Sequence, residues 1–280
     1  MRVGVLTDST NDIPREICEK YDIEVIPLKV MFDKETYRDN VDITPEEFYK
    51  KLKTSEKLPT TTQPTPAEFI QLYKKMSEKY DSIISIHISE KMSGTLASAF
   101  SAKSSLPDLD ITIIDSKITS IPIGYIVMEA AKAAKEGKSK QEIIDMVNNK
   151  LEKIKILFLP KTLEYLKKGG RIGAAKSLLA VALKIQPILT VKEGEVAPYK
   201  NVRHWNRAKQ ELINIYKNVF NIKKGGVVII GHSDNIEDAK DIETKAKDAF
   251  KPKEIYTWLI GCIIGTHLGP GAVALSYLEP

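Results

Sequence analysis

Short runs of β-branched residues alternate with amphipathic helical patterns in the first half of the chain. The runs predict strands because they are too short for most helices, and the segments between them repeat apolar positions at helical spacing. The predicted strands cover residues 3–6, 23–32, 82–88 and 111–114, and the predicted helices cover residues 14–21, 44–53, 65–80, 96 onward, 123–134 and 139–151. This order predicts a mainly parallel sheet with helices on both faces.

The second half of the chain mixes a hairpin with further strand and helix patterns. Residues 187–191 and 196–199 flank Lys192-Glu193-Gly194-Glu195, which is a hairpin signal. The other predicted strands cover residues 154–159, 227–231, 255–260 and 273–277, and the predicted helices cover 161–168, 174–183, 205–219 and 236–250. We therefore predict an α/β protein with two α/β domains, residues 1–155 and 156–280, the first with a mainly parallel sheet flanked by helices.

A strand-to-helix junction at Ser93-Gly94-Thr95 is the first candidate for a binding site. Free backbone N–H groups and the helix dipole at such a junction suit an anion such as a phosphate or a carboxylate. Ser is also a favoured N-cap residue, so the junction by itself leaves a structural role for Ser93 equally open. Asp8 and Ser9, at the end of the first strand, leave the same two roles open.

Three other loops are rich in hydroxyl groups or glycine. Residues 58–66 contain three prolines and four threonines, among them Thr60-Thr61-Thr62, and this composition slightly favours a spacer over a ligand-facing loop. Residues 169–173 contain Arg171, and the glycine-rich segment 263–272 contains His267. These groups suit an oxyanion head group, and we expect His267 to act near a ligand.

Capping boxes, with Ser or Thr three residues before Glu, predict where three of these helices begin. They are Thr44 with Glu47, Thr65 with Glu68, and Ser139 with Glu142.

Composition narrows the class of protein without identifying a function. The chain has 280 residues with 42 basic and 37 acidic side chains, and charges of both signs alternate along it, so no basic tract favours nucleic-acid binding. Cys18 and Cys262 lie far apart, which fits a reducing cytoplasm rather than a disulfide framework. No signal peptide is visible at the start of the sequence, and we expect no membrane span because no apolar run is long enough.

Familiar catalytic and cofactor motifs are missing from the sequence. No Walker A loop, dinucleotide fingerprint or G-x-S-x-G elbow is present, and the four histidines have no metal-ligand spacing. We therefore expect neither a metal nor a cofactor, and His87, within a strand, is interpreted as structural. Ser93 and His267 have the residue types of a nucleophile and its base, so a hydrolase or phosphotransfer enzyme remains an alternative. A binding module for a phosphorylated small molecule is a third reading.

Five segments together resemble the DegV family of fatty-acid-binding proteins. They are Thr7-Asp8-Ser9-Thr10, Pro59-Thr60-Thr61-Thr62-Gln63-Pro64, Ser93-Gly94-Thr95, Gly169-Gly170-Arg171-Ile172 and Gly265-Thr266-His267-Leu268-Gly269-Pro270-Gly271-Ala272. Each segment is a weak signal, but they occur in order over nearly the whole chain. The chain departs from the family pattern at Thr62, where serine is usual, and at Gly173, where serine is frequent.

The resemblance implies a carrier, not an enzyme, that holds one long-chain, palmitate-like fatty acid between two domains. It places Thr61 or Thr62, together with Ser93, Gly94 and Thr95, at the carboxylate, with His267 nearby. It also places Arg171 at the pocket mouth, where it contacts a partner. In some bacteria such proteins present the fatty acid to a separate ATP-dependent kinase, and the resemblance also admits a transient membrane contact.

The acyl chain of such a ligand needs an apolar tunnel. Candidates for its wall are Met92, Leu178, Leu179, Val181, Leu183, Ile263 and Ile264, each of which is equally compatible with ordinary core packing.

Overall fold

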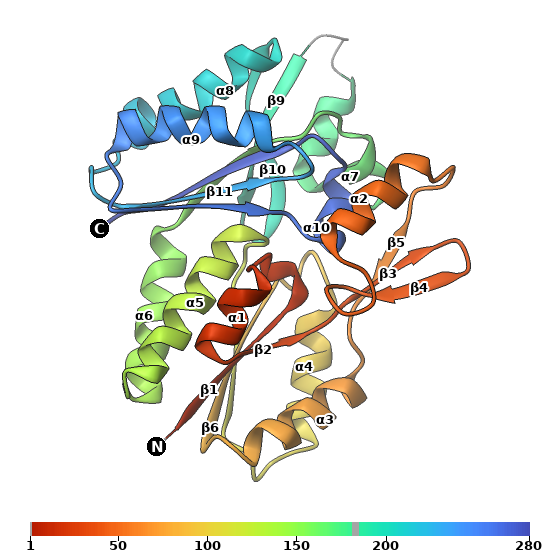
Figure 1. Cartoon of the computed structure of the whole chain (residues 1–280), viewed down its shortest axis with the longest axis vertical. Helices are drawn as coiled ribbons and strands as arrows, with labels where there is room; N and C mark the ends of the chain where they lie inside the picture. Colours follow the sequence, from red (N-terminus) through yellow and green to blue (C-terminus); the bar gives the residue numbers. More distant parts are fainter. Residues whose placement is uncertain (1, 181–184) are drawn as a thin grey trace.

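A computed structural model describes residues 2–180 and 185–280 of the chain (Figure 1). Its first sheet is parallel throughout, in the order β2-β1-β6-β7, as the strand and helix pattern predicted. The strands are β1 (Val3–Asp8), β2 (Ile23–Ile26), β6 (Ser82–His87) and β7 (Ile111–Asp115). Alternate residues of β1 pack on opposite faces, with Val3 and Val5 in one core cluster and Leu6 in another, so both faces are buried.

Helices cover both faces of this parallel sheet. One face packs against α1 (Arg15–Tyr21), α5 (Ile121–Lys135) and α6 (Lys140–Lys153), and the other against α3 (Pro66–Ser77) and α4 (Thr95–Ser104) (Figure 1). The capping boxes at Thr44, Thr65 and Ser139 are all formed. Ser93 does not take the N-cap position considered for it, because Gly94 occupies that position in α4.

A small antiparallel sheet lies beside the parallel one. It contains β3 (Lys29–Phe32), β4 (Glu35–Arg38) and β5 (Thr60–Thr62), in the order β4-β3-β5, and α2 (Pro45–Thr54) lies between β4 and β5 in the chain. The single strand predicted over residues 23–32 is therefore wrong, since β2 and β3 belong to different sheets. Pro27 lies between them and lacks the N–H group that would continue a strand ladder. The threonine loop forms β5 rather than an irregular spacer.

The third sheet contains six strands in the order β10-β9-β8-β13-β11-β12, with only β11 and β12 paired in parallel. The strands are β8 (Lys155–Leu159), β9 (Ile185–Lys192), β10 (Glu195–Arg203), β11 (Val227–His232), β12 (Glu254–Leu259) and β13 (Val273–Leu278). The hairpin β9–β10 was predicted. One face packs against α8 (Trp205–Asn214) and α9 (Ile236–Phe250), and the inner face packs toward α5 and the parallel sheet.

Three segments of the second half differ from their predicted form. The glycine-rich segment contains a helix, α10 (Cys262–Leu268), whose Gly265 packs so closely on α2 that a Cβ atom would lie 2.6 Å from the Tyr49 hydroxyl. A helix was predicted over residues 174–183. The described part of this segment forms a 3₁₀ helix, η2 (Gly173–Ala180), and residues 181–183 lie outside the described residues. The helix predicted over 205–219 consists of two parts: the α-helix α8 and, directly after it, a π-helical turn, η3 (Ile215–Val219).

The predicted domain boundary falls at β8, the first strand of the third sheet. The main core cluster nevertheless extends from β1 and β6 across α5 to the inner face of that sheet, so the two parts share buried surface. The short helix α7 (Glu164–Lys168) follows β8 and contacts α10. Within residues 2–180 and 185–280, no helix combines the length and apolarity needed to cross a membrane.

Candidate functional site

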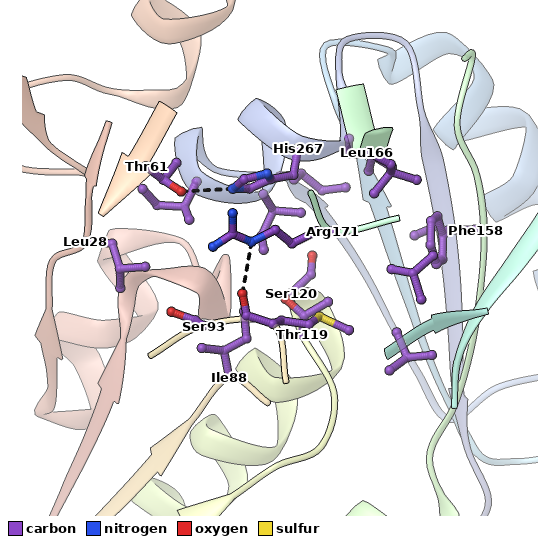
Figure 2. A pocket seen from close by; sticks show the side chains of 18 of the residues that line it. Leu28, Thr61, Ile88, Ser93, Thr119, Ser120, Phe158, Leu166, Arg171 and His267 are labelled. Atoms are coloured by element: carbon purple, nitrogen blue, oxygen red, sulfur yellow. Dashed lines mark hydrogen bonds between the residues drawn. The ribbon is translucent and has the colours of Figure 1, made fainter. Parts of the chain in front are cut away.

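A pocket lies where the parallel sheet, the small sheet and the inner face of the six-stranded sheet meet (Figure 2). Its empty space, including the open mouth, is about 820 Å³. Apolar side chains form most of the wall: Leu28, Ile88, Met92, Ile156, Phe158, Leu166, Val191, Val196, Ile260, Ile263, Ile264, Leu268 and Ala274. The pocket therefore provides an apolar lining drawn from both halves of the chain.

Polar side chains gather toward one part of this pocket. Thr61, Ser93 and His267 surround the guanidinium of Arg171, and we call these four residues the polar end (Figure 2). The aromatic ring of Phe158 lies on the opposite side of the pocket (Figure 2). The remaining polar lining residues are Gln63, Thr119 and Ser120. A pocket with one polar end and a long apolar wall fits an amphipathic ligand.

Strand register decides which threonine of β5 reaches the pocket. Thr61 lies opposite Val30 and Thr62 lies opposite Lys29 in the antiparallel pair β3–β5, so the two threonines point to opposite faces. Val30 is fully buried, and Thr61 on the same face lines the pocket. Thr62 shares the other face with Lys29 and does not line the pocket.

Thr61 and His267 are joined across 206 residues by a hydrogen bond of 2.9 Å between Oγ1 and Nε2. The other ring nitrogen, Nδ1, is buried without a hydrogen-bond partner among the described residues. An unpartnered lone pair is tolerated better than an unpartnered N–H, so we assign the ring proton to Nε2, which donates to Thr61. The hydroxyl proton of Thr61 is then free to donate into the pocket.

His267 is uncharged at neutral pH. Burial lowers its pKa to about 4, with a further contribution from the positive charge of Arg171. Its ring fits against Gly169, where a Cβ atom would lie 2.2 Å from Nδ1, so this glycine leaves the room that the imidazole occupies. The histidine therefore orients a hydroxyl rather than providing a positive charge.

Arg171 supplies the charge at the polar end. It is the one charged side chain among the described residues that line the pocket. Its Nε donates to the carbonyl of Met92 at 3.1 Å and its Nη1 donates to the carbonyl of Gly169 at 2.7 Å, so it joins the two halves of the chain while its side chain stays exposed. A cation beside two hydroxyl groups favours an anionic head group.

Ser93 lies just before α4, with its side chain half-buried. Its Oγ is 2.8 Å from the hydroxyl of Thr95 and accepts a hydrogen bond of 3.3 Å from the Thr95 N–H. Ser93 and His267 thus have different hydrogen-bond partners, and the pair that the hydrolase alternative requires is not joined. Thr95 is buried and does not line the pocket; neither does Gly94, where a Cβ atom would lie 2.7 Å from the Gln63 amide nitrogen.

Three polar lining residues were not predicted as site residues. Gln63 directly follows the threonine loop, and Thr119 and Ser120 follow β7 after a short turn. The rule that ligands bind beyond the carboxyl ends of parallel strands could have pointed to Thr119 and Ser120.

The apolar candidates divide into three groups. Met92, Ile263 and Ile264 line the pocket, while Leu178 packs against the core elsewhere and Leu179 is 43% exposed. Val181 and Leu183 lie outside the described residues.

A second chain of polar groups lies inside the parallel sheet. Asp8 Oδ2 is 2.9 Å from His87 Nδ1, and His87 Nε2 is 2.6 Å from the hydroxyl of Ser85. Although these are the residue types of a hydrolytic triad, Ser85 is fully buried, so the arrangement is structural. Ser9 accepts a hydrogen bond from the Leu28 N–H and does not line the pocket either. No group of three or more acidic, histidine or cysteine side chains in the described ranges could hold a metal ion.

Comparisons with known proteins agree on one family. The family model for uncharacterised proteins of the DegV family matches residues 2–280. A DegV domain-containing protein of Clostridium perfringens is 38% identical over 283 residues, which is 99% of each chain. A fatty-acid-binding DegV family protein of Thermus thermophilus superposes with a TM-score of 0.94 at 30% identity over the full length of both chains. DegV of Bacillus subtilis, also described as a fatty acid binding protein, superposes with a TM-score of 0.91 at 32% identity over the same extent.

Proposed function

This chain belongs to the DegV family, and on that premise we propose that it binds one long-chain, palmitate-like fatty acid in the pocket between its sheets. The observation that carries the proposal is the division of one pocket into a polar end and an apolar wall. A phosphate-binding module would not need the apolar wall. A hydrolase would need Ser93 joined to His267 as its base, whereas His267 is bound to Thr61 and Ser93 to Thr95. Solved relatives described as fatty-acid-binding proteins support the same ligand class.

In the proposed complex the carboxylate lies among the polar-end residues. The hydroxyls of Thr61 and Ser93 donate to its oxygens, and the guanidinium of Arg171 compensates its charge. A carboxylate placed in an apolar pocket without such partners would be very costly. Thr95 orients Ser93, and Gly94 lets the Gln63 amide approach, whereas the side chain of Thr62 points away.

The acyl chain provides most of the binding free energy. Each buried CH₂ group contributes about 0.8 kcal/mol, so a long tail against this wall needs few polar contacts to bind firmly. The tail extends from the polar end toward Phe158 and Ala274 on the inner face of the six-stranded sheet. No cofactor is required for this function.

Mass spectrometry of the purified full chain under native conditions tests the proposal. We expect one bound fatty acid, identified after solvent extraction, and renewed uptake of palmitate by the delipidated protein. Ser93→Ala should weaken this uptake, while Ser101→Ala, an exposed position on α4, should not. A delipidated protein that takes up no fatty acid at micromolar concentrations would contradict the proposal.

We also infer that the protein is a carrier in lipid transport or fatty acid metabolism. Its bound carboxylate would be presented at the mouth, beside the exposed Arg171, to a separate ATP-dependent fatty acid kinase. Loading would occur through transient contact with a membrane, and the two free thiols fit the cytoplasm. Incubating loaded protein with such a kinase and ATP should yield an acyl phosphate, and Arg171→Ala should reduce its rate of formation.

A further inference from the structure

Asp12 connects two distant segments of the chain behind the pocket. It follows a short 3₁₀ helix, η1 (Ser9–Asn11), and is only 5% exposed. Its Oδ2 accepts a hydrogen bond from the hydroxyl of Ser120, which is 108 residues away. Its Oδ1 accepts one of 2.9 Å from the backbone N–H of Gly261, which is 249 residues away. One carboxyl group therefore holds parts of both halves of the chain.

The first of these partners belongs to the pocket wall. Ser120 lines the pocket and has a φ of 67° and a ψ of −147°, a backbone conformation that residues with a side chain rarely adopt. Such a conformation persists only where the surroundings hold it. The hydrogen bond to Asp12 is the side-chain contact that holds Ser120 in place.

The second partner is the start of the helix that carries His267. Gly261 is the N-cap of α10 and, having no side chain, cannot cap the helix itself. The carboxyl of Asp12 instead accepts a hydrogen bond from the free N–H of this N-cap residue, and it approaches so closely that a Cβ atom on Gly261 would lie 3.0 Å from Oδ1. Because α10 has only seven residues, the position of its first turn fixes the position of His267 in its last turn.

Neighbouring acids do not duplicate these contacts. Asp8 is bound to His87 and to the Ile88 N–H, inside the parallel sheet. Asp39 lies beside Gly261 and Cys262 at the start of α10, but it makes no hydrogen bond to Ser120. Asp12 is therefore the acidic residue whose hydrogen bonds link Ser120 in the pocket wall to the start of α10.

We propose that Asp12 is a positioning residue for the polar end of the pocket. Its carboxyl group holds Ser120 and the start of α10 in place, so that His267 forms its hydrogen bond with Thr61 in the geometry that binds a carboxylate. The proposal rests on the proposed fatty-acid function. It predicts a defect in recognising the head group, because the apolar wall near Phe158 lies on the other side of the pocket (Figure 2).

The test compares palmitate with 1-hexadecanol, which has the same chain but no carboxylate. The delipidated full chain and its variants are titrated with both ligands by displacement of a fluorescent fatty acid. We expect Asp12→Ala to weaken palmitate binding about tenfold and hexadecanol binding less than threefold. Asp12→Asn should restore most of the loss, because its amide oxygen can accept from the Gly261 N–H while its NH₂ group donates to the Ser120 hydroxyl. Asp248→Ala, an exposed position on α9, is the matched control and should change neither affinity.

An equal loss of affinity for both ligands in Asp12→Ala would overturn the proposal, because it would show a general structural role. An unchanged palmitate affinity would overturn it as well.

If Asp12→Ala does not fold, the variant Ser120→Ala tests the proposal instead. It removes one of the two contacts and should lower the ratio of palmitate to hexadecanol affinity, whereas an unchanged ratio would overturn the inference. A wild-type protein that binds neither ligand would instead refute the fatty-acid function, and this inference with it.

Discussion

Thr61 and Thr62 have the same side chain, yet only one of them reaches the pocket. The difference comes from the pairing of β5 with β3, which turns Thr61 toward His267 and Thr62 toward the side of Lys29. The hydroxyls, glycines and cation of the candidate loops indicated an oxyanion site, although the composition of residues 58–66 alone slightly favoured a spacer. The resemblance to the DegV family assigned the threonine loop, Ser93 and His267 to a carboxylate and Arg171 to the pocket mouth. The residue types could not distinguish the two threonines, since that choice depends on pairing with strand residues 31 and 33 positions away.

The two threonines offer a matched pair of variants. Thr61→Val should weaken palmitate binding about tenfold, because it removes a hydroxyl that donates to the carboxylate while keeping the shape of the side chain. Thr62→Val should change the affinity by less than about twofold. Isothermal titration of the delipidated proteins measures both, and equal losses at the two positions would contradict the register described here.

The buried carboxyl of Asp12 makes stability depend on pH in a particular direction. Burial raises its pKa to about 8, and the negative charges of Asp39 and Asp8 raise it further, while the hydrogen bonds from Ser120 and Gly261 oppose the shift. Because the folded pKa lies above that of the unfolded chain, the contribution is fully present below about pH 4 and is lost as the pH rises through about 8.

Asp12→Asn should therefore flatten the pH dependence of stability. From pH 6 to pH 8 the free energy of unfolding of the wild type should fall by up to about 2.7 kcal/mol more than that of the variant. Asp39, whose pKa is raised to about 6, and Asp8, whose pKa is lowered, contribute to both proteins and largely cancel in the difference. Urea unfolding at both pH values measures it, and parallel curves would show that Asp12 carries no raised pKa.

At the scale of elements, the inner face of the six-stranded sheet shapes the pocket floor. Phe158 on β8 lies directly opposite Ala274 on β13, so a large side chain stands beside a small one. An acyl tail that follows the wall away from the polar end reaches this pair. We infer that the sizes of these two side chains limit the length of chain that fits.

Two substitutions should shift the preferred chain length in opposite directions. Ala274→Leu fills the space beside Phe158, so the best-bound saturated fatty acid should be shorter by about two carbons. Phe158→Leu enlarges the floor and should improve binding of longer chains, by up to about fourfold for each added CH₂ that becomes buried. Competition among fatty acids of graded length measures the preference, and an unshifted optimum in both variants would place the tail elsewhere.

The elements were predicted well where local chemistry determines them. Capping boxes located the starts of three helices, and the alternation of strands and helices gave the parallel sheet. Residues 23–32 were predicted as one strand because their apolar pattern continues through Pro27, whereas the chain changes sheets there. The glycine-rich segment forms α10 because its glycines allow close packing against α2 and α7, and this tertiary reason leaves no helical signal in the local sequence.

At the scale of the whole molecule, the ligand would contact both halves of the chain and so oppose their separation. Palmitate at one hundred times its dissociation constant should stabilise the folded protein by about 2.7 kcal/mol, because it binds only the folded state. For a chain of 280 residues the unfolding midpoint should rise by about 5 °C. Calorimetry with and without palmitate measures the shift, with 1-hexadecanol as the control for the tail alone. An unchanged midpoint despite measured binding would mean that the unfolded chain binds equally well.

The position of β13 has a consequence for how the protein is made. Among the described residues this strand comes last in sequence, but it pairs in the middle of the six-stranded sheet, between β8 and β11. It also carries Ala274 in the pocket floor. During synthesis the parallel sheet emerges from the ribosome early, since all its strands precede residue 116. The pocket floor, in contrast, cannot close until translation has passed residue 278. Until β13 has taken its place in the sheet, a nascent chain would expose the apolar wall, and lipid capture would begin only after that step.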